Sequence, residues 1–228
     1  MGLTKEQWMD VIEDIKTKVY SGVSPTRQKT ETPAEGKLPD MLFAEMKHCI
    51  GLDYKKPYMR AGEYFYKPYR NHYVAVPEDE PMWEALVEKR LAWIGAMYHL
   101  SIEGICLLRW QTGIYIYNPN GGERLLREVK DYFIYRGVDC SYDCWRPVTK
   151  SDVKGVCILT RKKTDLAIKK LLEEGWIVPY KDAGKTTEGF PYCRMGFRAS
   201  KKLEETEEFK KAWKEKCAAL GAIVRGEN

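Results

Sequence analysis

The apolar residues near the start of the chain recur at helical spacing. Behind Thr4, large apolar side chains fall three or four positions apart up to residue 20, and Gln7 stands three residues after Thr4. A threonine followed three positions later by a glutamine is the sequence signature of a capping box. The pattern therefore predicts an amphipathic helix over residues 4–20.

The helical pattern then stops and resumes in shorter pieces. Residues 21–40 contain several prolines and glycines and few large apolar groups, which is typical of a flexible linker. A short helix is expected around residues 42–49, and Pro81 fits the first turn of another. Aromatic residues and prolines are frequent in residues 62–81 and favour extended chain there.

Two further breaks divide the chain. Short apolar runs on either side of Gly95 predict a tight hairpin. The sequence NPNGG at 118–122 follows a brief strand and is the best candidate for a domain boundary. We therefore expect an N-terminal helix (1–20), a flexible linker (21–40), an aromatic-rich helix and hairpin domain (41–117) and a C-terminal domain (118–228).

Amphipathic segments return in the C-terminal domain. Residues 123–136 repeat apolar side chains at helical spacing, and Gly137 is expected to end that helix. Thr149 and Asp152 then form a second capping box, which predicts a short helix at 150–156.

The next helix is expected to pack its apolar side into the core. Thr160 caps this helix and Gly175 ends it. Two strands joined by a long polar loop follow, the first directly after Gly175 and the second at 192–200. Four apolar side chains should be buried together where the helix meets the first strand: Leu171, Leu172, Trp176 and Ile177.

Three helices followed by a two-stranded hairpin resemble a winged helix-turn-helix domain. The resemblance covers residues 122–203 and is carried by LLEEGWI followed by FRASKK, which is similar to the helix-to-wing passage of bacterial transcription regulators. The sequence departs from the family pattern at Leu203, where a glycine often follows the second wing strand, and in its long wing loop. The resemblance implies an α+β fold of the winged helix-turn-helix type with flanking helices.

A weaker echo of the same order occurs in the first half of the chain. LVEKRLAW followed by YHLSIEG matches the helix-to-wing passage in order and character. Residues 41–110 are therefore either a second, degenerate winged unit or an unrelated helix and hairpin. The order of YKPYRNHYVA and WEALVEKRLA also resembles uncharacterised small proteins of bacterial viruses and mobile elements.

Composition and charge indicate where the protein works and what kind of surface could bind a partner. The 228 residues carry 38 basic and 33 acidic side chains, a net charge of +5, so a local basic patch matters more than the total. No apolar run is long enough to span a membrane, and the first residues do not resemble a secretion signal, so we expect a cytoplasmic protein of a bacterial host cell. The seven cysteines are an odd number without paired spacing, which favours reduced thiols.

No arrangement of residues in the sequence predicts an enzyme. His48, His72 and His99 lack the spacing of a zinc site, and Cys140 with Cys144 would need two further ligands. No glycine-rich loop with a phosphate-binding lysine precedes a helix. We therefore expect no catalytic residue, no metal and no cofactor.

The resemblance implies that the third helix enters the major groove of duplex DNA. Arg161 at its start can bind a guanine through its two-donor fork, while Lys162, Lys163 and Lys169 neutralise phosphates. The wing and its flank would extend the positive charge through Lys181, Lys185, Arg194, Arg198, Lys201 and Lys202. The expected partner is duplex DNA, and a homodimer is expected to bind it.

A second interpretation stays open, in which the chain binds a protein. Near-balanced charge, Glu173 and Glu174 beside the reading helix, and the long wing favour a factor that blocks a host nucleic-acid enzyme, as anti-defence inhibitors of the anti-CRISPR type do. The aromatic segment offers anchors for such a partner at Tyr66, Tyr69, Arg70 and Tyr73. The same segment also fits the stacking of unpaired bases or the packing of a core.

Overall fold

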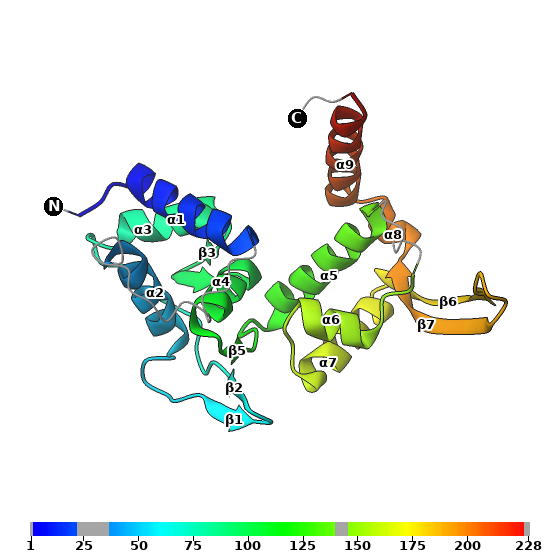
Figure 1. Ribbon diagram of the computed structural model, residues 1–228, viewed down its shortest axis with the longest axis horizontal. Helices are drawn as coiled ribbons and strands as arrows, with labels where there is room; N and C mark the ends of the chain where they lie inside the picture. The colour runs from blue at the N-terminus through cyan, green and yellow to red at the C-terminus, as the bar shows by residue number, and fades with distance from the viewer. Residues whose placement is uncertain (1, 22–36, 140–145, 226–228) are drawn as a thin grey trace. The chain divides into compact units, whose positions relative to one another are not determined.

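The computed structural model describes residues 2–21, 37–139 and 146–225 of the chain. These residues belong to two compact units, residues 1–120 (unit 1) and residues 121–228 (unit 2). Both units combine helices with small sheets, so the fold is mixed α+β (Figure 1). None of the described helices is both long enough and apolar enough to cross a membrane.

The helices described in unit 1 are α1 (Lys5–Tyr20), α2 (Lys37–Ile50), α3 (Glu80–Glu88) and α4 (Ile102–Thr112). The capping box expected at α1 is confirmed. The Thr4 side chain accepts a hydrogen bond from the backbone N–H of Gln7, and the Gln7 side chain accepts one from the backbone N–H of Thr4. Pro81 lies in the first turn of α3, as expected.

Two expectations for unit 1 need correction. The last residues of the expected linker are helical, because α2 begins at Lys37, while residues 22–36 lie outside the described part of the chain. Pro39 is tolerated there since the first turn of a helix has no intrahelical use for a backbone N–H. The sequence pattern also does not predict α4, whose apolar side chains lie on several sides and leave no single stripe.

The strands described in unit 1 form two small sheets. One contains β1 (Tyr58–Arg60), β2 (Glu63–Tyr66) and β5 (Tyr115–Ile116) in the order β1-β2-β5, with β2 and β5 parallel. The other is the hairpin expected around Gly95, made by β3 (Ala92–Ile94) and β4 (Tyr98–Leu100). The helices and the inner face of the larger sheet enclose a core of fully buried side chains, including Ile12, Leu42, Met46, Tyr66, Trp83, Leu86, Leu108 and Ile116.

Unit 2 begins with the helices α5 (Gly122–Val138), α6 (Lys150–Val156) and α7 (Arg161–Glu173), followed by the hairpin strands β6 (Ile177–Lys185) and β7 (Pro191–Ala199) and by the helices α8 (Lys201–Glu204) and α9 (Glu207–Arg225). The expected caps of α6 and α7 are confirmed. The Thr149 hydroxyl accepts from the backbone N–H of Asp152, and the Thr160 hydroxyl accepts from that of Lys163. Gly175 follows α7 with a left-handed φ of 72°.

Gly137 does not end α5, as the sequence pattern predicts, but lies inside the helix. A Cβ at this position would lie 2.7 Å from the ring of Phe209 on α9. The glycine is therefore explained by the close packing of α9 on α5 and not by a helix terminus.

The predicted contact between α7 and the first hairpin strand is half right. Leu171 and Ile177 are buried, each with an exposed fraction of 1%. Leu172 and Trp176 are only half-buried, so their expected burial is wrong. The Trp176 ring lies at the surface under two ammonium groups, with Lys130 Nζ 4.7 Å and Lys202 Nζ 4.0 Å from its centroid.

Two features fix α7 and the hairpin to the rest of unit 2. The turn between α6 and α7 consists of the buried residues Cys157, Ile158 and Leu159, and Ile158 has a left-handed φ of 55°. The hairpin is tied to the segment before α6 by the backbone bridge between Val148 and Phe197, which exchange two hydrogen bonds of 2.9 Å. Both elements are therefore held in place by backbone geometry as well as by side-chain packing.

Candidate nucleic-acid interface

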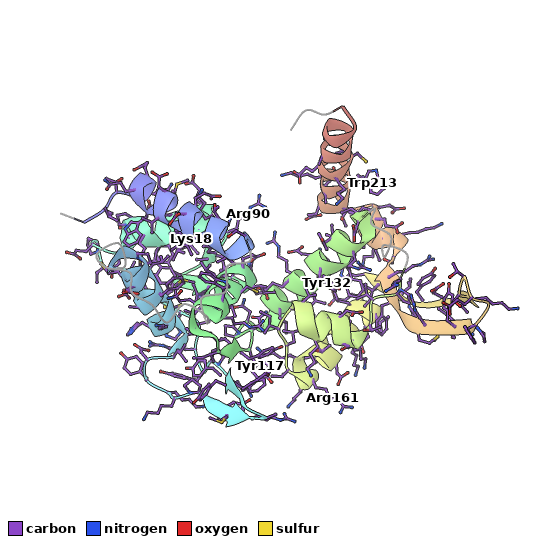
Figure 2. All side chains as sticks on the ribbon, viewed as in Figure 1. Lys18, Arg90, Tyr117, Tyr132, Arg161 and Trp213 are labelled. Atoms are coloured by element: carbon purple, nitrogen blue, oxygen red, sulfur yellow. The ribbon has the colours of Figure 1, made fainter. Side chains whose placement is uncertain are left out.

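Helix α7 has one face in the core of unit 2 and one in solvent. Thr164, Ala167, Ile168 and Leu171 are its buried side chains. Their 3.6-residue spacing leaves the opposite side of the helix to solvent. The exposed side chains, which we call the α7 surface, are Arg161, Lys162, Leu166, Lys169, Lys170 and Glu173. Arg161 lies in the first turn of α7 (Figure 2). Its side chain is 94% exposed.

The first turn of α7 differs in charge from those of the other described helices. Each of the others has an acidic residue in its first turn, where the positive end of the helix dipole favours negative charge. The first turn of α7 has no acidic residue and begins instead with Arg161, Lys162 and Lys163. This end of the helix therefore concentrates positive charge on exposed donors, which suits the binding of an anion.

The two acidic side chains of α7 are engaged by basic neighbours. Asp165 Oδ1 lies 2.6 Å from Lys150 Nζ, and its Oδ2 lies 4.0 Å from Arg161 Nε. The hydrogen bond from Lys150 lowers the pKa of Asp165, so this carboxylate stays ionised. Glu173 Oε1 lies 3.7 Å from Lys169 Nζ at the other end of the helix. Lys162, in the first turn, is exposed.

The four basic side chains predicted on the hairpin do not share one face. In the antiparallel register, Lys181 is opposite Met195 and Lys185 is opposite Pro191, so the two lysines lie on one face. Arg194, opposite Asp182, and Arg198, opposite Val178, lie on the other face. The sequence does not reveal this division because the face of each residue depends on how the strands pair.

Arg194 lines a hollow of unit 2 together with arginines that sequence reasoning missed. The hollow lies between α5, the segment around the start of α6 and β7, and its lining also includes Arg136, Arg146, Tyr132, Thr149 and Asp152. Arg136 Nη1 lies 3.3 Å from Asp139 Oδ2. No local pattern points to this cluster, because the pairing of Val148 with β7 is what brings these positions together.

Lys202, expected to extend the basic surface, has a different role. Its ammonium donates a hydrogen bond of 2.7 Å to the backbone carbonyl of Glu174, directly after α7, and covers the Trp176 ring. A cation at the end of a helix satisfies a carbonyl and complements the negative end of the dipole. Lys201 is exposed on α8.

No protein family, curated protein or solved structure matches this chain.

Two of the aromatic side chains expected to anchor a protein partner pack within unit 1, Tyr66 in its core and Tyr73 half-buried. Tyr66 is 1% exposed, and its hydroxyl donates to the Ile50 carbonyl at 3.1 Å. Burial raises the pKa of Tyr66 to about 12. Tyr73 stacks on Trp83, with ring centroids 4.7 Å apart, and its hydroxyl donates to Asp79. The Tyr66 ring is therefore not available to a partner, and the half-buried Tyr73 ring is engaged on one face by Trp83.

The other two expected anchors lie nearer the surface. Tyr69 is 57% exposed, and its ring lies against Gly51, where a Cβ would approach it to 2.4 Å. Arg70 donates to the carbonyl of His48, and its guanidinium lies 5.2 Å from the centroid of the Tyr54 ring. These contacts make Arg70 part of the packing around the end of α2.

The histidines have structural contacts or lie in solvent. His48 Nδ1 is 2.9 Å from Asp53 Oδ2, and His99 stacks on Trp93 with ring centroids 4.0 Å apart, while His72 is exposed. Within residues 2–21, 37–139 and 146–225, no three His, Cys, Asp or Glu side chains come together as a metal site would require. Cys140 and Cys144 lie outside the described residues.

Proposed function

We propose that unit 2 is a winged helix-turn-helix domain that binds duplex DNA, with α7 as its reading helix and the β6–β7 hairpin as its wing. The order of α5, α6, α7 and the hairpin supports this assignment. The tight turn at Ile158 supports it too, because a helix-turn-helix joins its second and third helices through a short turn.

The observation that carries the proposal is the charge at the start of α7. Basic residues in the first turn of a helix oppose the dipole and weaken the helix locally. Residues that are unfavourable for the local structure occur mainly where a function requires them. A phosphate or a base edge at this end would turn Arg161, Lys162 and the free backbone N–H groups into favourable contacts.

The exposed side chains then divide between base reading and phosphate binding. Arg161 is 94% exposed at the tip of α7 and has the two-donor fork that matches guanine O6 and N7. Lys162 and Lys169 follow along the same side of the helix and suit phosphates. A duplex can lie against one face of the hairpin only. Because the Arg194 and Arg198 guanidinium groups lie over the rings of Tyr192 and Tyr180, we assign the phosphate contacts to Lys181 and Lys185 on the other face.

Base reading by Arg161 can be tested by its dependence on sequence. A preferred duplex is selected from a random pool, and the affinities of wild type, Arg161→Ala and Arg161→Lys are compared on it and on a scrambled duplex. Loss of the fork should cost about 1 to 3 kcal/mol on the preferred duplex and much less on the scrambled one. Lysine should not restore the preference, because it lacks the bidentate geometry.

The matched control for this experiment is Arg127→Ala on α5, an exposed arginine outside the α7 surface. Its affinities for both duplexes should equal those of wild type. Equal losses on the two duplexes for Arg161→Ala would mean that Arg161 contacts phosphate, and no loss on either would remove it from the interface.

Exposed apolar side chains on the same elements favour a second candidate, an inhibitor that binds a host nucleic-acid enzyme. Leu166 on α7 is 55% exposed, Phe190 in the loop of the hairpin 64% and Met195 on β7 63%. Large apolar residues and methionine are favoured at the centre of protein interfaces. In this case duplex affinity would not depend on Arg161, and Phe190→Ser would abolish the recovery of the enzyme with the chain.

A further inference from the structure

The three-stranded sheet of unit 1 has an outer face covered by aromatic rings. Its inner face carries Tyr66 and Ile116, which are 1% and 0% exposed. Residues directly opposite on neighbouring strands share a face, as do residues two apart. The pairs Tyr58 with Phe65 and Phe65 with Tyr115 therefore place these rings together on the outer face, and Tyr117 continues from Tyr115.

The outer rings contact one another as a continuous layer. The Phe65 ring is 5.9 Å from Tyr58, 5.3 Å from Tyr115 and 6.3 Å from Tyr117, measured between ring centroids. The rings of Tyr58 and Tyr117 are nearly parallel to that of Phe65, at 23° and 26°. Tyr58 is 50% exposed and the other three are half-buried. The outward side of a small sheet is usually polar, so an aromatic layer on this side indicates a binding surface.

Two arginines border the aromatic layer. The guanidinium carbon of Arg109 lies 4.2 Å from the centroid of the Tyr115 ring. Arg60 is two residues after Tyr58 on the same face, opposite Glu63 in the register, and its positive charge acts on Tyr117. Flat rings next to guanidinium groups are the combination that binds unpaired bases and their phosphates. The outward residues of the three strands are these rings, Arg60 and Glu63, with no aliphatic side chain among them, so the face offers stacking and charge more than aliphatic contact.

We propose that the outer face of the β1-β2-β5 sheet is a stacking platform for the unpaired bases of single-stranded nucleic acid. Tyr58, Phe65 and Tyr117 lie under the bases, and Arg60 and Arg109 bind the phosphates. Tyr117, labelled in Figure 2, belongs to unit 1, whereas α7 belongs to unit 2. The platform is a binding site separate from the duplex-reading helix, so either can fail without the other.

The test measures the binding of labelled twelve-nucleotide dT and U strands to the full chain by fluorescence anisotropy. The replacements Tyr58→Leu and Tyr117→Leu remove rings and keep apolar side chains. Each should weaken binding roughly 5- to 100-fold, the range expected for the loss of one stacked base. The tighter of the two strands indicates whether the natural ligand is DNA or RNA.

Two controls separate stacking from folding. Met59 is 62% exposed on β1 beside Tyr58 but lies on the opposite face of the sheet, so Met59→Ala should bind like wild type. Arg161→Ala in unit 2 should also leave single-strand binding unchanged. Tyr58 lies on the edge strand, where replacement disturbs the sheet least, and its variant should melt at the wild-type temperature.

A second readout locates the strand directly. Irradiation of the complex with a bromouracil-containing strand should crosslink peptides that contain Tyr58 or Tyr117. The proposal is overturned if neither strand binds, if the Met59→Ala control loses as much affinity as the platform variants, or if crosslinks occur only in unit 2.

Discussion

Leu166 and Leu171 show how the environment of a residue decides its effect on stability. Both are leucines of α7, but Leu171 is 1% exposed and Leu166 is 55% exposed. Replacing a buried leucine removes its burial free energy and leaves a cavity. Leu171→Ala should therefore lower the free energy of unfolding by about 2 to 5 kcal/mol, measured by urea denaturation.

Leu166→Ala is the matched control and should change the free energy of unfolding by less than about 0.5 kcal/mol. Similar losses for the two variants would mean that α7 does not pack as described here. Leu166 would then belong to the core, and it would no longer count among the exposed residues of the α7 surface.

At the scale of elements, two glycines of unit 2 should respond to alanine in opposite ways. A Cβ at Gly196 on β7 would lie 2.5 Å from the Val148 carbonyl oxygen, which is fixed by its backbone bridge. A Cβ at Gly155 on α6 would meet nothing within 4 Å. Gly196→Ala should cost about 1 to 3 kcal/mol through overpacking, whereas Gly155→Ala should stabilise α6 by up to about 1 kcal/mol.

Thermal melts followed by circular dichroism can check both predictions: a lower melting temperature for Gly196→Ala and an equal or higher one for Gly155→Ala. If Gly196→Ala melts at the wild-type temperature, the hairpin is not held by the contact between Val148 and Phe197. If Gly155→Ala lowers the melting temperature, the surroundings of α6 are more crowded than the structure indicates.

The sequence predicts those elements whose signals are local. Thr4, Thr149 and Thr160 mark helix starts because a cap and its partner lie within one turn. The sequence does not predict helix α4, because its apolar side chains form no single stripe. It wrongly predicts a helix end at Gly137, because this glycine is required by the Phe209 ring, which lies far along the chain. The faces of the hairpin residues also stay hidden until the strand register is known.

At the scale of the whole molecule, the two candidate sites differ in how far the sequence reveals them. The basic start of α7 is a contiguous run, so Arg161, Lys162 and Lys163 are visible directly. The aromatic platform of unit 1 joins β1 and β2 to Tyr115 and Tyr117, about fifty residues later. The aromatic segment suggests rings, but only the pairing of β2 with β5 shows which of them face outward.

The central claim is that the α7 surface binds the phosphates and bases of duplex DNA. Each phosphate contact releases condensed counterions, so the logarithm of affinity falls with the logarithm of salt concentration by about 0.9 per contact. A Lys162→Ala and Lys169→Ala double variant removes two proposed contacts. A Lys211→Ala and Lys214→Ala double variant on α9 is the matched control, since Lys211 pairs with Glu215 at 4.0 Å much as Lys169 pairs with Glu173.

The most direct measurement is therefore the duplex affinity of wild type and both double variants across a series of salt concentrations. The slope for the α7 variant should be smaller than that of wild type by about two, while the α9 variant keeps the wild-type slope. Wild-type binding that is absent at micromolar protein, or equal slopes for the three proteins, would contradict duplex binding by α7.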